Sequence, residues 1–270
     1  MTAVAPTRPP ALADRPARQS VPWPAALATL ARRRALAAVR AGDVVFATLG
    51  PVIFFVCFYV PLHRQFERVG GEYAQFLAPI VLLQAGVFTA IVTTEAAGED
   101  AREGVRQRLA SLPIPRVTPF LARMAWVSVR MLLILVGGLA IAFALGFRFH
   151  GSVWATLAFL GLVVLFGLSL SMLTDAVGTV AGNATSVATV LMIPQLILVL
   201  ASTGLLPAAA FPEWVQPFVR NQPLSVFAEA LRGLAAGSAI AWTAVLCWSA
   251  GLLLIGAAAA VAAGRAQVRR

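Results

Sequence analysis

The sequence predicts an all-α integral membrane protein, because its apolar residues are too numerous and too continuous for a soluble core. Hydrophobic residues make up 60% of the 270 residues, charged residues make up 12%, and the mean hydropathy is +0.84. Uncharged runs of about 20 residues recur, which is the length that crosses a bilayer as a helix. The runs lack the alternation typical of β-barrel strands, so helices must pair the backbone groups.

Six of these runs are expected to cross the membrane, each as one helix. The uncharged runs 176–212 and 233–264 are too long for one crossing and too short for two good ones, so we place one span in each. Asp175 is expected in a cytoplasmic turn between the fourth and fifth spans. The expected transmembrane domain covers residues 42–264, with spans at about 44–62, 73–94, 125–147, 151–174, 187–206 and 240–263.

The basic side chains predict the orientation of the chain, because short cytoplasmic loops carry an excess of positive charge. The chain contains no lysine, so all 21 basic side chains are arginines. Placing both termini inside the cell leaves 16 arginines at the inner face and five at the outer face. The sequence therefore predicts cytoplasmic N- and C-termini, which requires an even number of spans and agrees with six.

The regions that flank the transmembrane domain are expected to lie on the cytoplasmic side. Residues 1–22 are rich in proline and lack the apolar core of a signal peptide, so we expect a disordered arm. Residues 23–41 carry an apolar stripe opposite several arginines, which predicts a helix that lies in the membrane interface. Arg34 interrupts this stripe. Residues 265–270 are expected to form a short tail.

Charge and composition exclude several classes of function. The net charge of +10 comes from arginines beside membrane spans, where anionic lipid headgroups are nearer than nucleic acid, so no nucleic-acid partner is expected. Cys57 and Cys247 lie in separate apolar spans without metal-ligand spacing, so we expect buried thiols and no metal site. No carboxylate pair or activated nucleophile accompanies the two histidines, so no catalytic residue is predicted.

The most informative polar segment lies between the second and third expected spans. Acidic residues open it and arginines close it, an order that favours a short helix, and Pro113 ends that helix. The pattern alone is also typical of a solvated, salt-bridged helix that merely joins two spans. The candidate functional residues of this segment are Glu99, Asp100, Arg102, Glu103, Arg106, Arg108, Leu109 and Leu112.

A second informative segment, rich in proline and aromatic residues, separates the fifth and sixth expected spans. Its prolines prevent a regular helix, and non-helical backbone at membrane depth must be shielded by protein. An ordinary outer loop anchored by its tryptophan is the alternative. The candidate gate residues are Pro212, Trp214, Gln216, Pro217, Phe218 and Pro223, with Glu229 and Arg232 as an ion pair three residues apart.

Polar side chains within the spans are candidates for a cargo path, because such groups are rare in hydrocarbon. The candidates are Gln84, Asn183 and Gln195. Hydrogen bonds between helices are the common alternative role for such residues.

Together, the two polar segments resemble ABC-2 type permeases, and within that family the daunorubicin-resistance and mycobacterial-type lipid exporter permeases. The first segment carries Glu99-Asp100, Arg102-Glu103-Gly104, Arg108-Leu109 and Leu112-Pro113, and the second carries Pro212-x-Trp214-x-Gln216-Pro217-Phe218 and Gln222-Pro223. The resemblance implies that the first segment docks on an ATPase and that short helices of the second dip back into the membrane from outside.

The resemblance also implies the function of a permease subunit of an ATP-binding cassette exporter, which moves an amphiphilic drug or lipid outward across the bacterial plasma membrane. A Walker A loop needs a lysine, so this chain is expected to bind no cofactor, and ATP and magnesium are expected on a separate ATPase. The implied partners are two ATPase chains, a second permease chain that is identical or a related paralogue, and membrane lipids. A membrane-embedded lipid-modifying enzyme and a noncatalytic scaffold or channel are the alternatives.

Overall fold

The structure is a computed structural model that describes residues 22–67, 72–102, 115, 117–181 and 183–268. Every regular element in this part of the chain is a helix, which confirms the predicted all-α class. The elements are α1 (Trp23–Arg40), α2 (Asp43–Glu67), α3 (Tyr73–Arg102), α5 (Thr118–Ala144), α6 (Val153–Val180), α7 (Ala184–Leu200), the 3₁₀ helix η2 (Ala208–Ala210), α8 (Gln216–Asn221), α9 (Pro223–Ala236) and α10 (Trp242–Val268).

Long apolar helices make this chain a multi-pass membrane protein. Among the described residues, five helices are long and apolar enough to cross a bilayer: α2, α3, α5, α6 and α10. The apolar helix α7 has 17 residues, which is close to the lower limit for a crossing. The expected fifth span, 187–206, therefore corresponds to a shorter helix that begins three residues earlier, at Ala184.

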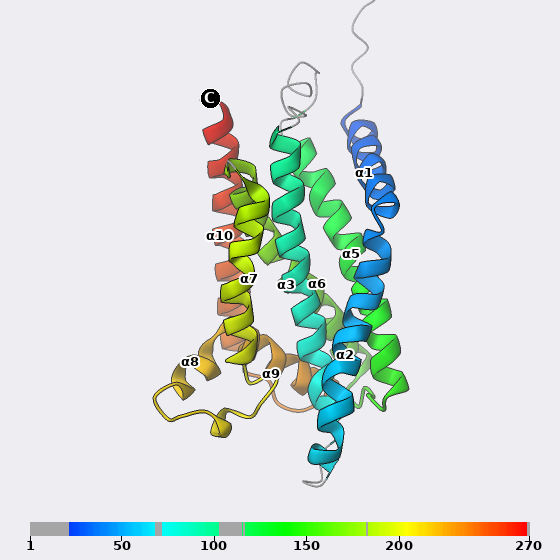
Figure 1. Cartoon of the computed structure of the whole chain (residues 1–270), viewed down its shortest axis with the longest axis vertical. Helices are drawn as coiled ribbons and strands as arrows, with labels where there is room; N and C mark the ends of the chain where they lie inside the picture. The colour runs from blue at the N-terminus through cyan, green and yellow to red at the C-terminus, as the bar shows by residue number, and fades with distance from the viewer. Residues whose placement is uncertain (1–21, 68–71, 103–114, 116, 182, 269–270) are drawn as a thin grey trace, which may run out of the picture.

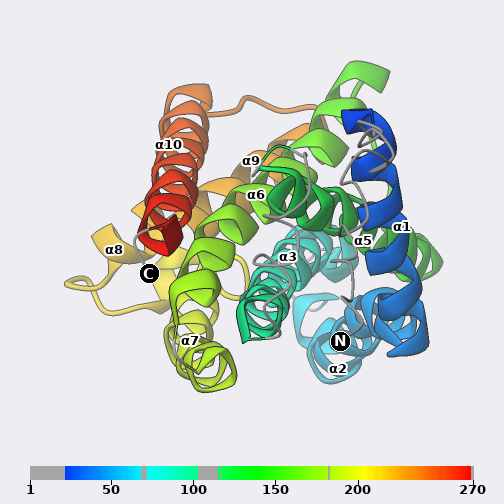
Figure 2. The same cartoon turned by 90° about the horizontal axis from the view of Figure 1, so that it is seen from above.

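The helices form an upright bundle around α3 (Figure 1). In its most apolar window, 78% of α3 is buried, whereas the corresponding values for α2 and α10 are 17% and 22%. In the view along the bundle, α2 and α7 lie on either side of α3 (Figure 2). Glycines allow α3 and α6 to approach closely. A Cβ atom placed on Gly86 of α3 would already contact the backbone of Gly167 on α6.

The two ends of the bundle differ. One end, called here the α1 end, holds α1 and the C-terminal end of α10, whereas α8 and α9 lie at the opposite end, called the α9 end (Figure 1). Helix α1 lies obliquely across its end and packs against α5 and α2 (Figure 2). At the α9 end, Trp154, Trp214 and Trp242 are exposed, as in the aromatic belt of a membrane protein.

Three expectations from the sequence are wrong. Asp175 lies inside α6, which continues to Val180, because a buried arginine on α5 compensates its charge. The polar segment after the second span does not begin as a separate short helix, since α3 continues without a break from Tyr73 to Arg102. Cys57 and Cys247 are exposed on the outside of the bundle and are not buried, because α2 and α10 are peripheral helices.

Candidate functional site

A network of ion pairs joins four helices at the α1 end of the bundle. Arg123 of α5 donates to both carboxylate oxygens of Asp175 on α6, from Nη2 at 2.9 Å and from Nε. Its Nη1 donates to Asp100 of α3 at 3.2 Å, and Arg34 of α1 donates to the same Asp100 carboxylate. This Arg123 network therefore connects α1, α3, α5 and α6.

Burial makes the Arg123 network a strong constraint on the helices. The side chains of Arg123 and Asp175 are only 3% and 2% exposed. Removing one member of a buried pair leaves the other charge uncompensated, which costs about 3–5 kcal/mol. Helices α5 and α6 can therefore separate at this end only if Arg123 and Asp175 both find other partners. Otherwise the two helices move as one unit.

A second ion pair lies deeper in the bundle. Arg130 of α5 pairs with Asp43 at the start of α2, and its Nε donates to Thr89 Oγ1 of α3 at 3.1 Å. Trp126 donates from Nε1 to Asp43 at 3.2 Å, which fixes the carboxylate from a second side. The start of α2 is therefore held against α5 and α3 by polar contacts.

The described coupling candidates are divided between this network and the surface. Asp100 belongs to the Arg123 network, whereas Glu99 is exposed and forms no ion pair or hydrogen bond with any described residue. Arg102 donates to Asn183 Oδ1 at 3.0 Å. The other candidates, Glu103, Arg106, Arg108, Leu109 and Leu112, lie outside the described residues.

The three candidates for a cargo path do not come together. Asn183 is the N-cap of α7, where its side chain accepts a hydrogen bond from Ser186 N at 3.3 Å, so it joins the end of α3 to the start of α7 through Arg102. Gln195 is buried on α7, and its Oε1 has no hydrogen-bond partner among the described residues. Gln84 lies on α3 and lines a pocket.

This pocket, called here the α1–α5 pocket, lies between α1, α2, α3 and α5 and has a volume of about 580 Å³. Its walls are mainly apolar, with Phe46 and Phe54 from α2, Val81 and Phe88 from α3, and Ile134 from α5. Its polar lining comprises Arg34, Asp43, Gln84, Thr93, Glu99, Arg123 and Arg130. The pocket thus combines an apolar wall with charged groups, which suits an amphiphilic molecule.

At the α9 end, the half-buried Arg232 and the buried Gln222 bind the backbone at and just after the end of α7. Arg232 of α9 donates to the carbonyl oxygens of Thr203 at 2.9 Å and Gly204 at 2.8 Å, and also to that of Phe76 on α3. Gln222 donates to the carbonyl oxygens of Leu198 and Ala201. The bonds from Gln222 satisfy acceptors that α7 leaves open at its C-terminal end, and the bonds from Arg232 hold the turn after α7 against α3.

The predicted gate residues surround this structure at different depths. Pro223 is the first residue of α9, and Glu229 pairs with Arg232 at 3.1 Å on the same helix. Gln216 donates to Phe211 O at 3.0 Å and accepts from Arg220. The exposed gate residues are Pro212, Trp214, Pro217 and Phe218. Within this set, the structure shows polar contacts to another long helix only for the Glu229–Arg232 pair, through the bonds of Arg232 to Phe76 on α3.

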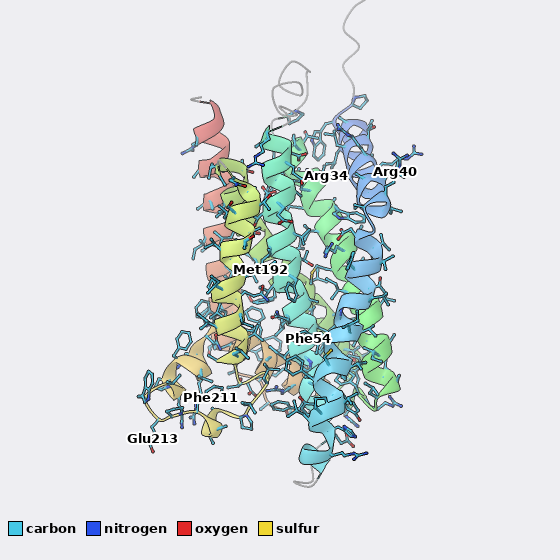
Figure 3. All side chains as sticks on the ribbon, viewed as in Figure 1. Arg34, Arg40, Phe54, Met192, Phe211 and Glu213 are labelled. Carbon is cyan, nitrogen blue, oxygen red and sulfur yellow. The ribbon has the colours of Figure 1, made fainter. Side chains whose placement is uncertain are left out.

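Arg232 and Asp100 apart, the side chains that make the most contacts between helices were not among the sequence candidates. They are Arg34, Asp43, Arg123, Arg130, Asp175 and Gln222. A signal for one of them was present, because Arg34 interrupts the apolar stripe of α1. Figure 3 shows the reason: Arg34 lies on the side of α1 that faces the other helices, whereas Arg40 points away from the bundle. A charge on an apolar stripe thus indicated an oppositely charged partner on another helix.

Comparisons with known proteins give the chain its relatives. The family model described as ABC-2 family transporter protein matches residues 60–264. The doxorubicin resistance ABC transporter permease protein DrrB of Mycobacterium tuberculosis is 38% identical over 215 residues, which cover 76% of this chain and 74% of the relative. The daunorubicin resistance ABC transporter permease protein DrrB1 of Streptomyces coeruleorubidus is 30% identical, covering 79% and 76%. The probable doxorubicin resistance permease protein DrrC of M. tuberculosis is 27% identical, covering 78% of each chain.

Proposed function

This chain belongs to the ABC-2 family of transporter proteins, and from this membership we propose that two permease chains and two ATPase chains form a pump that expels an amphiphilic drug or lipid. The chain itself is a permease subunit of an ABC exporter in the bacterial plasma membrane, which confirms the predicted family, subfamily and function class. Its relatives are named as permeases, so the chain is a transport component, and the ATPase is a separate subunit.

In the proposed pump, ATP and magnesium bind to the ATPase chains, and closure of these chains moves the α1 end of the permease. The segment from Glu99 to Leu112 receives this movement. The contacts of Arg102 with α7 and of Asp100 with α1 and α5 support this role, because they join the C-terminal end of α3 to three other helices. A push on this segment would therefore be passed to several spans at once.

The proposed topology has six spans with both termini in the cytoplasm. It is supported by α1 and the end of α10 lying at the same end of the bundle, which requires an even number of crossings, with α7 as the sixth (Figure 1). The excess of arginines at that end favours the cytoplasm for it. Helices α8 and α9 are proposed to re-enter the membrane from outside, supported by the buried face of α9 and by the bonds that Arg232 makes to α3.

The second permease chain is proposed to pack on the face formed by α2 and α7. Large apolar side chains are exposed on both helices, and α7 buries only four residues: Ala184, Ala188, Gln195 and Val199. An apolar face of this kind can contact lipid or protein, and a pump for a bulky cargo needs a second half to enclose the path. Co-expression distinguishes an identical second chain from a paralogue: a homodimer needs only this gene beside that of the ATPase, whereas a heterodimer also needs the gene of the paralogue.

The observation that carries the proposal is the match of residues 60–264 to the ABC-2 family together with relatives named as drug-resistance permeases. The test is co-expression with the cognate ATPase, purification through a tag on the permease, and measurement of ATP-dependent movement of amphiphiles into inside-out vesicles. The proposal predicts copurification of the ATPase and accumulation of cargo that stops when the ATPase is inactive. A permease that purifies without an ATPase, or accumulation that ignores ATP, would contradict it.

A further inference from the structure

The α1–α5 pocket has a size and a lining that suit a specific ligand. Its volume of about 580 Å³ lies within the range of about 300–1,000 Å³ that is usual for small-molecule sites. Most of the wall is aromatic or aliphatic, so that an apolar body can be buried there. Phe46 and Phe88 line the pocket and are also exposed, which places its opening between α2 and α3.

An unpaired polar group lies in this apolar wall. Gln84 is only 4% exposed, and its Oε1 has no hydrogen-bond partner among the described residues. A buried acceptor without a donor costs about 1–3 kcal/mol, and water is scarce at the depth of a membrane span. A ligand with an N–H or O–H group at this position would supply the missing donor.

The charges of the pocket favour a cationic ligand. Each of its three arginines is paired with an aspartate: Arg34 with Asp100, Arg123 with Asp175, and Arg130 with Asp43. Glu99 also lines the pocket, at its α1 end, and no described residue pairs with it. The uncompensated charge among the described lining residues is therefore a carboxylate, which attracts an amine or another cation.

The two groups also set the length of the ligand. Gln84 and Glu99 are 15 positions apart on the continuous helix α3, which corresponds to about 22 Å along its axis. We propose that the α1–α5 pocket binds an elongated cationic amphiphile, with its cation beside Glu99, its apolar body between α2, α3 and α5, and a hydrogen-bond donor on Gln84. This inference rests on the proposed function, since it names the class of cargo that the pump takes up from the membrane.

The test measures binding to the full-length permease in lipid nanodiscs without the ATPase. Three probes of equal chain length separate the two contacts: a long-chain amine with a terminal hydroxyl, the plain long-chain amine, and the neutral diol. We expect Gln84→Leu to weaken binding of the hydroxylated amine and of the diol by about tenfold and to leave the plain amine unchanged, because the plain amine has no terminal donor for Gln84. We expect Glu99→Gln to weaken both amines and to leave the diol unchanged.

Matched variants outside the pocket serve as controls. Glu95→Gln removes a carboxylate one turn earlier on α3, and Ser249→Ala removes a buried unpaired hydroxyl on α10. These variants should bind all three probes as the unchanged protein does. Equal loss of all probes in a pocket variant and its control, or no loss in Gln84→Leu and Glu99→Gln, would overturn the inference.

Export measured with the ATPase separates this inference from the proposed function. If the unchanged complex exports the hydroxylated amine while both pocket variants export it at the same rate, the pocket inference is wrong and the pump stands. If the probes bind as predicted but no complex exports any amphiphile in an ATP-dependent way, the proposed function is wrong.

Discussion

Arg123 on α5 and Asp175 on α6 form a two-bond ion pair that is almost fully buried at the α1 end of the bundle. The two residues are 52 positions apart in the chain. Their pairing explains why a helix can carry an aspartate inside an apolar run, since the arginine compensates the charge and also binds Asp100 on the central helix α3. The pair therefore links stability to the arrangement of the spans.

Removing one charge of this pair should destabilise the protein strongly. Asp175→Asn is expected to lower the free energy of unfolding by about 3–5 kcal/mol, because Arg123 stays buried without its main partner. The measurement is denaturant unfolding of the purified permease in detergent micelles. Glu213→Gln is the control, because Glu213 is exposed and points away from the bundle (Figure 3). A double variant, Arg123→Met with Asp175→Leu, should lose less than Asp175→Asn alone, and equal or greater loss would contradict this explanation.

Reversing the charge of Arg102 should impair coupling without unfolding the bundle. Arg102 is exposed and donates to Asn183, the N-cap of α7. In Arg102→Glu this donor is replaced by an acceptor, so we expect export per ATP hydrolysed to fall several-fold. Arg265→Glu, an equal change on the exposed last turn of α10, is the control. Export is measured in vesicles that hold the permease and its ATPase, and unchanged export at normal assembly would remove Arg102 from the coupling role.

Arg232 should hold the end of α7 in place. Arg232→Met removes the donors to the carbonyl oxygens of Thr203, Gly204 and Phe76, at a cost of about 1–3 kcal/mol for each buried acceptor left unpaired. The variant should unfold at a lower denaturant concentration than Arg220→Met, which loses only an exposed bond to Gln216. Similar midpoints for the two variants would show that these carbonyls do not depend on Arg232.

The close contact between Gly98 of α3 and Ala184 of α7 should have room for only one methyl side chain. A Cβ atom at Gly98 would overlap the Cβ of Ala184, at the start of α7. Gly98→Ala is therefore expected to lower the Tm, and adding Ala184→Gly should restore part of the loss, because it removes the overlapping methyl group. The measurement is thermal unfolding of the single and double variants. Failure of the second change to restore any stability would contradict this contact.

The helical fold could be predicted because long uncharged runs are a local property of the sequence. The corrections concern residues whose surroundings come from distant parts of the chain. An isolated charge in an apolar run predicts a turn at Asp175, but the partner that allows this charge inside a helix lies on α5. Arg34 interrupts the apolar stripe of α1 in the sequence, but spacing within one helix does not identify its partner on α3.

The candidate site was predictable to a similar degree. Glu99, Asp100 and Arg102 do lie together at the C-terminal end of α3, because they are neighbours in the chain. The α1–α5 pocket could not be predicted, since four helices supply its walls, and nothing in the local sequence distinguishes Gln84 from Gln195 as the residue that lines it. Which glutamine lines a pocket depends on how the helices pack against one another, and the sequence of a single helix does not specify that packing.

The dependence of this permease on a separate motor is tested most directly by reconstitution in sealed vesicles with a fluorescent amphiphile. Vesicles that contain the permease alone should neither move nor modify the amphiphile when ATP is added. Vesicles that also contain the cognate ATPase should transport it, and an ATPase variant that cannot hydrolyse ATP should abolish the transport. Equal transport or chemical conversion by the permease alone would contradict its function as a permease subunit that depends on a separate ATPase.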